Sequence, residues 1–465
     1  MGKSKKSEGR RDGGAEGKAK ELSRRDFVQA SGAAAAAFTI VPRHVLGGKG
    51  YVAPSDKPNV ACIGAGGKGR SDIDGVRDAG GNIYAFADVD DESAADAYRS
   101  YPNVPRFKDY REMLDKMGKN IDAITVSIPD HSHASAAMLG LRAGKHVFCQ
   151  KPLARTLYEV RTLEQTAAAN PKLSTQMGNQ GHAGEGTRVV REWVEAGVIG
   201  TLREVQYWTN RPIWPQGLDR PLEAYNVPPT LDWNLWLGPA PARPYHPSYC
   251  PFNWRGWWDF GTGALGDMAC HGMDAAFWAL GFKWPTRVEA ECTELHPESG
   301  PKSSRITYWF PPKGNYPEIK VTWRDGGLNP VRPTGLDPAK PWPIADIGGQ
   351  IWIGDEGTLI AGMYGEDPFL VDAKKDAAVR ANPPAKKYAR SPGHYVEWIN
   401  GMKGGAKPMS SFDGHAGPLT EMVLLGVLAA RTGARLDIDQ TTGMATNVQL
   451  PALYLKPEFR SGWTV

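Results

Sequence analysis

Short apolar runs alternate with helix-like segments between residues 57 and 175. The apolar runs are Val60–Ile63, Ile83–Ala87, Ile121–Ile128 and His146–Cys149. Segments of helical composition lie between them, for example Ser93–Tyr98 and Ala134–Ala143. Buried strands of about four to eight residues that alternate with helices are typical of βαβ units and a parallel sheet. The pattern predicts a doubly wound α/β domain over residues 57–175.

After residue 175 the chain becomes rich in Trp, Gly and Pro. Strand-like alternation returns in four runs, Arg287–Thr293, Arg305–Phe310, Glu318–Trp323 and Gln350–Ile353. The stretch Glu421–Thr432 is a strongly apolar helix candidate. Consecutive strands of this kind predict an α+β domain over residues 176–440, built on an open, mainly antiparallel sheet. Residues 441–465 are expected to form a C-terminal tail that returns to the first domain.

The N-terminus has the layout of a twin-arginine export signal. A basic stretch leads into Ser23-Arg24-Arg25-Asp26-Phe27-Val28, followed by the apolar run Ala30–Val41. That run is roughly 12 residues long, whereas a bilayer span needs about 20, so it fits a signal core better than a permanent anchor. We expect residues 1–50 to direct export to the periplasm, with removal of the signal left open. The alternative is a disordered basic tail with a short buried helix.

Charge and cysteine content narrow the class of protein. Of 465 residues, 41% are hydrophobic and 23% are charged, which is ordinary for a globular protein. Eleven Lys/Arg and five Asp/Glu within residues 1–50 account for the formal net charge of +4, so the body is near neutral and nucleic-acid binding is not expected. The five cysteines have no C-x-x-C spacing, so we expect no metal site and read Cys62 and Cys149 as buried small hydrophobes.

A glycine-rich turn follows the first predicted strand. Gly64-Ala65-Gly66-Gly67-Lys68-Gly69 is a G-x-G-x-x-G motif that opens a helix. Glycines allow a tight turn and a close backbone approach to a pyrophosphate, whose charge meets the helix N-terminus. Asp88 ends the second strand, 19 residues past Gly69, where an acid accepts hydrogen bonds from ribose hydroxyls and repels a 2′-phosphate. The motif predicts a dinucleotide site that favours NAD, with NADP as the alternative.

Two further strand ends carry polar residues. One ends in Ser127-Ile-Pro129-Asp-His131-Ser-His133 and the other in Cys149-Gln150-Lys151-Pro152. Ligands of open α/β sheets gather at the carboxyl ends of the strands, so both segments should face the cofactor. A residue before proline is held extended, which predicts Lys151 as the last residue of its strand with its amine toward the crevice. Thr156–Glu159 reads as a capping box that starts the next helix.

A carboxylate and an imidazole lie four residues apart in Gly266-Asp267-Met-Ala-Cys-His271. In a helix predicted to continue through Phe277 and Trp278, positions i and i+4 share one face. An imidazole there can take a hydroxyl proton as hydride leaves the same carbon. The other interpretation is a helix-capping Asp and a core His.

Three motifs together resemble the Gfo/Idh/MocA oxidoreductase family, and the resemblance spans residues 58–440. They are the glycine motif Gly64–Gly69, the triplet Gln150-Lys151-Pro152 and the pair Asp267-x-x-x-His271. The resemblance implies a Rossmann domain followed by an α/β domain with an open antiparallel sheet, which relatives use for oligomer contacts, so a homodimer or homotetramer is expected. It implies that Lys151 orients the reacting oxygen, His271 is the general acid/base and Asp267 positions substrate. Gln150 departs from the usual Glu-Lys-Pro triplet. The run Trp233–Pro239 is similar to a secreted subgroup described as sugar dehydrogenases.

The substrate is expected to be a sugar. The chain holds 16 Trp, and Trp254, Trp257 and Trp258 cluster just before Asp267. Aromatic faces pack on the apolar faces of pyranose rings, and Arg255 can hydrogen-bond hydroxyls. Three residues of a Gly-rich segment, Asn179, Gln180 and His182, are further candidates to line the cleft. Ordinary core tryptophans are the alternative.

Export has a consequence for the reaction. Because free NAD is not expected outside the cytoplasm, the cofactor should stay bound and be recycled on the enzyme. A second carbonyl substrate can reoxidise it, or oxidation can be transient, with elimination and re-reduction giving NAD-dependent glycoside hydrolysis. A non-catalytic sugar-binding protein on a dinucleotide fold is the hypothesis from another class.

Overall fold

The computed structural model describes residues 56–343 and 347–465. The expected export signal, residues 1–50, lies outside these residues. The first sheet has six strands in the order β3-β2-β1-β4-β5-β6, and all neighbours pair in parallel. The strands are β1 (Asn59–Ile63), β2 (Asn82–Ala87), β3 (Arg106–Phe107), β4 (Ala123–Val126), β5 (His146–Cys149) and β6 (Thr175–Met177).

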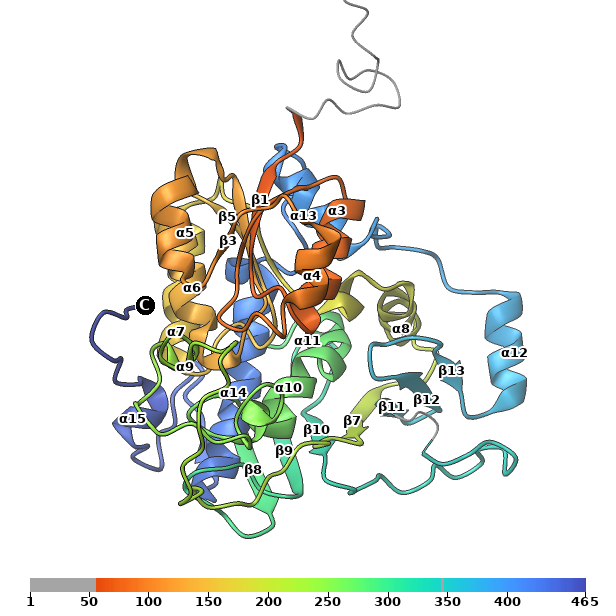
Figure 1. Cartoon of the computed structure of the whole chain (residues 1–465). Coiled ribbons are helices and arrows are strands. Elements are labelled where there is room, and N and C mark those ends of the chain that lie inside the picture. The colour runs from red at the N-terminus through yellow and green to blue at the C-terminus, as the bar shows by residue number, and fades with distance from the viewer. Residues whose placement is uncertain (1–55, 344–346) are drawn as a thin grey trace, which may run out of the picture. The chain divides into compact units, whose positions relative to one another are not determined.

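Helices cover both faces of this sheet (Figure 1). One face packs against α5 (Tyr110–Met117), α6 (Asp130–Arg142) and α7 (Leu157–Ala169). The other packs against α3 (Lys68–Asp78), α4 (Ala95–Ser100) and α13 (His394–Met402). Because both faces of the sheet are buried, the sequences of β1 and β4 are nearly continuous apolar runs. The Thr156–Glu159 capping box that starts α7 is confirmed.

The second sheet has eight strands in the order β13-β12-β11-β7-β10-β9-β8-β14. Only β10 and β7 pair in parallel, so the sheet is mainly antiparallel. Its strands are β7 (Leu202–Thr209), β8 (Arg287–Cys292), β9 (Ser304–Phe310), β10 (Ile319–Arg324), β11 (Gly348–Gly354), β12 (Thr358–Gly362), β13 (Phe369–Leu370) and β14 (Leu436–Asp437). The predicted fold class, a Rossmann-like domain followed by an α+β domain, is confirmed.

The remaining helices belong to this second part. They are α8 (Glu185–Glu195), α9 (Trp233–Leu237), α10 (Gly263–Gly272), α11 (Asp274–Leu280), α12 (Ala373–Ala381), α14 (Gly417–Thr432) and α15 (Ala452–Leu455). The long apolar α14 packs against β8, β9 and α10. The prediction of one helix from Gly266 through Trp278 is wrong, because Met273, with ψ of −7°, separates α10 from α11.

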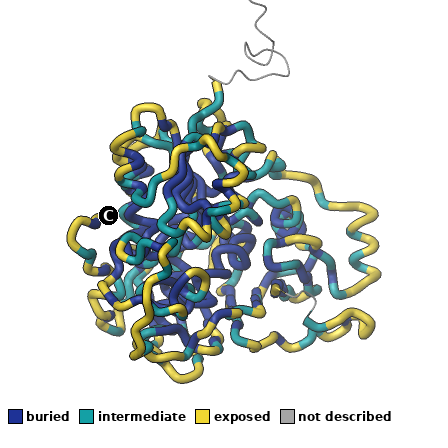
Figure 2. The backbone as a smooth tube through the Cα atoms, viewed as in Figure 1, coloured by how far each residue is buried: buried dark blue, intermediate teal, exposed yellow. Residues whose placement is uncertain are grey.

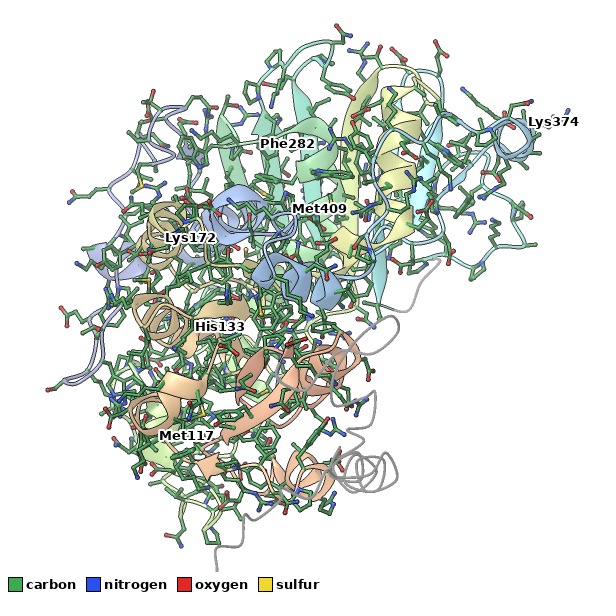
Figure 3. All side chains as sticks on the ribbon, turned by 90° about the horizontal axis from the view of Figure 1, so that it is seen from above. Met117, His133, Lys172, Phe282, Lys374 and Met409 are labelled. Carbon is green, nitrogen blue, oxygen red and sulfur yellow. The ribbon has the colours of Figure 1, made fainter. Side chains whose placement is uncertain are left out.

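Residues 57–465 form one compact unit, so the division at residue 175 stays a prediction. Buried residues follow both sheets and the helices on them (Figure 2). Helix α12 buries no residue and stands apart from the rest, as Lys374 shows in Figure 3. At the C-terminus, Trp463 contacts α5, with 6.0 Å between its ring centroid and that of Tyr110 and 4.0 Å to the Arg111 guanidinium.

All five cysteines are free, and Cys62 and Cys149 are buried as expected. Within the described ranges, no helix combines the length and the apolar character that a membrane crossing requires.

Candidate active site

The glycine turn after β1 is built so that other groups can approach its backbone. Gly64 has φ of +84°, and a Cβ there would lie 2.2 Å from the Ser127 carbonyl oxygen. A Cβ on Gly66 would meet Ser93, and one on Gly69 would meet the Gly64 carbonyl. Gly67 has φ of +50° and open space around it, and no side chain caps the N-terminus of α3. The turn therefore leaves helix N–H groups free for an anion, as a pyrophosphate requires.

Asp88 lies against this turn from the end of β2. Its Oδ2 accepts hydrogen bonds from the backbone N–H groups of Ala65, at 2.7 Å, and Gly66, at 3.3 Å. Burial raises the pKa of Asp88, while these N–H donors lower it. The carboxylate thus fixes the turn. It also lines a cavity that extends from the glycine turn, where an acid can accept hydrogen bonds from the ribose hydroxyls of NAD.

Gln150 faces a buried carboxylate below the turn. Its Nε2 donates to Asp72 Oδ2 at 2.9 Å, and Ser127 Oγ donates to the same oxygen at 2.7 Å. Asp72 Oδ1 accepts from Tyr395 of α13 at 2.6 Å and from Lys68. Asp72 is fully buried and lies on α3, whereas Gln150 is uncharged. The carboxylate of this region is therefore on α3 and not at position 150.

Lys151 and Asp267 form an ion pair across the two parts of the chain. Lys151 Nζ donates to Asp267 Oδ1 at 2.9 Å and to its carbonyl oxygen at 2.7 Å, and Arg255 Nε donates to Oδ1 at 3.2 Å. Burial raises the pKa of Asp267, but the charges of Lys151 and Arg255 outweigh it and bring that pKa to about 2. β5 ends at Cys149, and Lys151 follows two residues later, before a cis Pro152, so it is not the last residue of the strand as predicted.

His271 faces the same cavity one helical turn after Asp267. Its ring contacts Tyr364 edge-on, with 4.9 Å between centroids, and its Nδ1 is buried without a partner among the described residues. Burial and then the nearby charge of Lys151 lower the pKa of His271 to about 3. The imidazole is therefore neutral near pH 7, which is the state a general base needs.

The His133 ring contacts both segments that follow strands β4 and β5. Its ring nitrogens lie 2.8 Å from the carbonyl oxygen of Pro152 and 2.7 Å from that of Ile128, and burial lowers its pKa to about 4. It lies between the two parts of the chain in Figure 3. His131 instead contacts the carbonyl oxygens of Trp236 and Phe260 and does not line the cavity.

Asp130 is a site residue that the sequence analysis missed. It begins α6, lines the cavity and accepts a hydrogen bond from Thr262 at 2.8 Å. Burial raises the pKa of Asp130 to about 7, although Lys151 pulls it down. Its place directly after Pro129 at a strand end was a signal that could have identified it.

The titration of Asp130 should appear in protein stability. Since the folded pKa lies above the ordinary 3.8, the folded state holds an extra proton between about pH 4 and pH 7. Relative to Asp130→Asn, we expect the unfolding free energy of the wild type to fall by about 1 kcal/mol per pH unit as the pH rises through that window. Urea unfolding from pH 4.5 to 8 measures it. Exposed Asp78→Asn is the control, and parallel curves for wild type and Asp130→Asn would contradict the prediction.

One cavity of about 430 Å³ brings most of the predicted residues together. It is lined by Gly64, Gly66, Gly67, Asp88, Pro129, His133, Gln150, Lys151, Gln180, Trp254, Arg255, Asp267 and His271. The cavity is also lined by Arg211, Trp214 and Tyr364, which no sequence pattern had indicated.

Three predicted substrate residues do not line this cavity. Asn179 accepts a hydrogen bond from Ser410, and His182 contacts Asp274 in a buried cluster. Trp258 donates to the His296 carbonyl and packs in the core. Gly69 also lies outside the lining, because it packs under Gly64. The structure therefore supports none of these four as a direct ligand contact.

A segment of the second part lines the cavity near Asp88, at the expected dinucleotide end. Residues 231–260, here called the aromatic segment, pack Trp236, Tyr249 and Phe260 into one cluster with Val89. Asp232 N donates to the Val89 carbonyl at 2.8 Å, and Lys108 Nζ donates to the Thr230 carbonyl at 2.9 Å. Trp236 and Trp463 both line the cavity. Elements outside the first sheet thus line the dinucleotide end of the cavity.

Two family models of the Gfo/Idh/MocA oxidoreductases match the chain. The model of the NAD-binding Rossmann fold matches residues 58–178, and the model of the C-terminal alpha/beta domain matches residues 189–314.

Curated relatives are dehydrogenases of sugars and polyols. The chain is 25% identical over 201 residues to levoglucosan dehydrogenase of Pseudarthrobacter phenanthrenivorans, covering 42% of each chain. It is 29% identical over 144 residues to inositol 2-dehydrogenase/D-chiro-inositol 3-dehydrogenase of Lacticaseibacillus casei, covering 30% of this chain and 41% of that one. The matches span about two fifths of the length of these relatives.

Solved structures share the fold at low identity. Levoglucosan dehydrogenase in complex with NADH superposes with a TM-score of 0.56 and 19% identity, covering 83% of this chain and all of that one. The WlbA dehydrogenase of Bordetella pertussis, in complex with NADH and UDP-GlcNAcA, gives a TM-score of 0.57 and 16% identity, covering 82% and 99%.

Proposed function

Because the chain belongs to the Gfo/Idh/MocA oxidoreductase family and has its NAD-binding Rossmann domain, we propose that it oxidises a hydroxyl group of a sugar or glycoside and retains its cofactor between turnovers. The observation that carries the proposal is the convergence of Lys151, Asp267 and His271 in the cavity onto which the glycine turn opens.

Two side chains act on the reacting hydroxyl, and a third holds one of them in place. Bound NAD supplies the hydride acceptor. The neutral His271 imidazole takes the hydroxyl proton, and Lys151 donates a hydrogen bond to the same oxygen, so that negative charge developing there is stabilised. Asp267 holds the Lys151 ammonium in place through two oxygens.

Features of the cavity support a sugar as substrate. Trp214 and Trp254 offer aromatic faces beside Arg255, whose guanidinium lies 4.3 Å from the Trp254 ring centroid. Gln180 adds an amide to the same wall. This mixture of flat apolar surface and polar groups fits a pyranose ring and its hydroxyls. The similarity to levoglucosan and inositol dehydrogenases points to the same substrate class.

Retention of the cofactor is supported by the aromatic segment and by Trp463, which add contacts to the dinucleotide end of the cavity from outside the first sheet. It also agrees with the export that we propose from the twin-arginine motif in residues 1–50, because free NAD is not expected outside the cytoplasm. A cofactor that stays bound must be reoxidised on the enzyme.

The proposal is tested on the purified protein. After denaturation we expect about one NAD(H) per chain, and mixing with sugars and glycosides should change the near-ultraviolet absorbance of the bound nicotinamide. Gly66→Val, whose side chain would collide with Ser93, is the cofactor-free control. Glycoside cleavage with no net redox change would identify a redox-assisted hydrolase instead. Protein that holds no dinucleotide and binds none when supplied would refute both and leave a sugar-binding protein.

A further inference from the structure

Three buried side chains from distant parts of the chain contact one another outside the lining of the active-site cavity. His182 lies in the 3-10 turn Gln180–Ala183, Asp274 begins α11, and His415 lies in the π-helical turn Phe412–Ala416. His182 Nδ1 is 2.9 Å from Asp274 Oδ1, and His415 Nε2 contacts the same oxygen. The two imidazole rings stack with centroids 4.0 Å apart. One nitrogen or oxygen of each residue lies within 4.8 Å of the others.

Asp274 is a buried carboxylate whose direct contacts are the two imidazoles. The residue is 1% exposed, and across residues 56–343 and 347–465 its ion-pair partners are the two histidines alone. Arg188 donates to the His182 carbonyl and not to the carboxylate. A buried carboxylate is costly unless cations or hydrogen-bond donors stabilise it, and a cation bound between these three side chains would do so.

Two polar atoms of the cluster also lack partners. Asp274 Oδ2 and His182 Nε2 are buried and make no hydrogen bond within the described part of the chain. Buried polar groups are nearly always satisfied, so an unpartnered carboxylate oxygen suggests a missing ligand. His415 stands in a π-helical turn, a rare conformation that is frequent at functional sites.

We propose that His182, Asp274 and His415 bind one divalent transition-metal ion of the zinc type. Two imidazole nitrogens and a carboxylate are a common ligand set for such ions. The ion would take the place of the hydrogen bonds between the two rings and Asp274. Asp274 Oδ2 is available as a further ligand atom.

The ion has a structural role, because none of its three ligands lines the catalytic cavity. It would connect segments that begin and end far apart, since Asp274 is 92 residues from His182 and 141 from His415. Gln180 and His271 lie two and three residues before ligands and do line the cavity. The metal would therefore fix the positions of the two segments that bring Gln180 and His271 to the active-site cavity.

Metal analysis of the tag-free, full-length protein tests the proposal. We expect about one zinc or similar ion per chain by mass spectrometry, and loss of that ion in Asp274→Asn and His415→Gln. His394→Gln, which removes a buried histidine outside the cluster, should keep it. Replacement by Co²⁺ should give visible absorption bands of a site with nitrogen and oxygen ligands.

Anomalous scattering at the zinc edge on wild-type crystals gives an answer that needs no variant. A peak between the three side chains supports the proposal. It is overturned if the wild type carries no ion after incubation with Zn²⁺, Co²⁺ or Mn²⁺, or if Asp274→Asn retains the full metal content. All of these readouts are independent of sugar oxidation, so failure of the proposed activity would not be confused with failure of the metal site.

Discussion

Replacing Lys151 with methionine lowers the turnover of sugar oxidation about 10³-fold, while the amount of retained NAD stays the same. The reason is that in the proposed mechanism Lys151, which Asp267 holds in place, donates a hydrogen bond to the reacting oxygen, and methionine keeps the length of the side chain without the charge. The rate of nicotinamide reduction in single-turnover mixing with sugar measures the effect.

Lys172→Met, on the exposed surface, is the matched control. Because Lys151→Met leaves Asp267 with Arg255 as its remaining cation, thermal unfolding must be measured alongside. A folded, NAD-loaded Lys151→Met protein that reduces its nicotinamide at the wild-type rate would remove Lys151 from the mechanism.

Replacing His271 with asparagine is expected to lower the same rate about 10²- to 10⁴-fold, since it removes the proposed general base. The wild-type rate should show no acidic decline with a midpoint near pH 6.5 that is due to His271, because burial holds the pKa of this residue near 3. The pH dependence of single-turnover rates, recorded for the wild type and for His271→Asn, measures both expectations.

His394→Asn, a buried histidine outside the cavity, controls for loss of a core imidazole. If His271→Asn kept the wild-type rate at every pH, the proton would have to leave through another group, and Asp130 would be the next to examine.

The parts of the fold that the sequence predicted are those with a local signal. Strand β1, the glycine turn and Asp88 lie within 30 residues, and each follows from backbone requirements that sequence reveals directly. Strands β3 and β6 were missed because two and three residues are too few to give a pattern. The break at Met273 was missed because apolar periodicity continues through it.

The same distinction holds for the active site. Lys151 and the Asp267/His271 pair stand at places that spacing and neighbours identify, namely before a proline and one helical turn apart. His182 was predicted to contact substrate, yet it lies with Asp274, and a partner 92 residues away leaves no trace in local sequence. Tyr364 and Arg211 reach the cavity from the second sheet and its loops, where only the fold decides which side chain arrives.

The hydrogen bond between Gln150 and Asp72 makes the two positions depend on each other. A glutamate at position 150 would set two carboxylates in contact inside the protein, where their repulsion is strong. Asparagine at position 72 together with glutamate at position 150 would again pair an amide with a carboxylate. The two positions are therefore expected to tolerate exchange only as a pair.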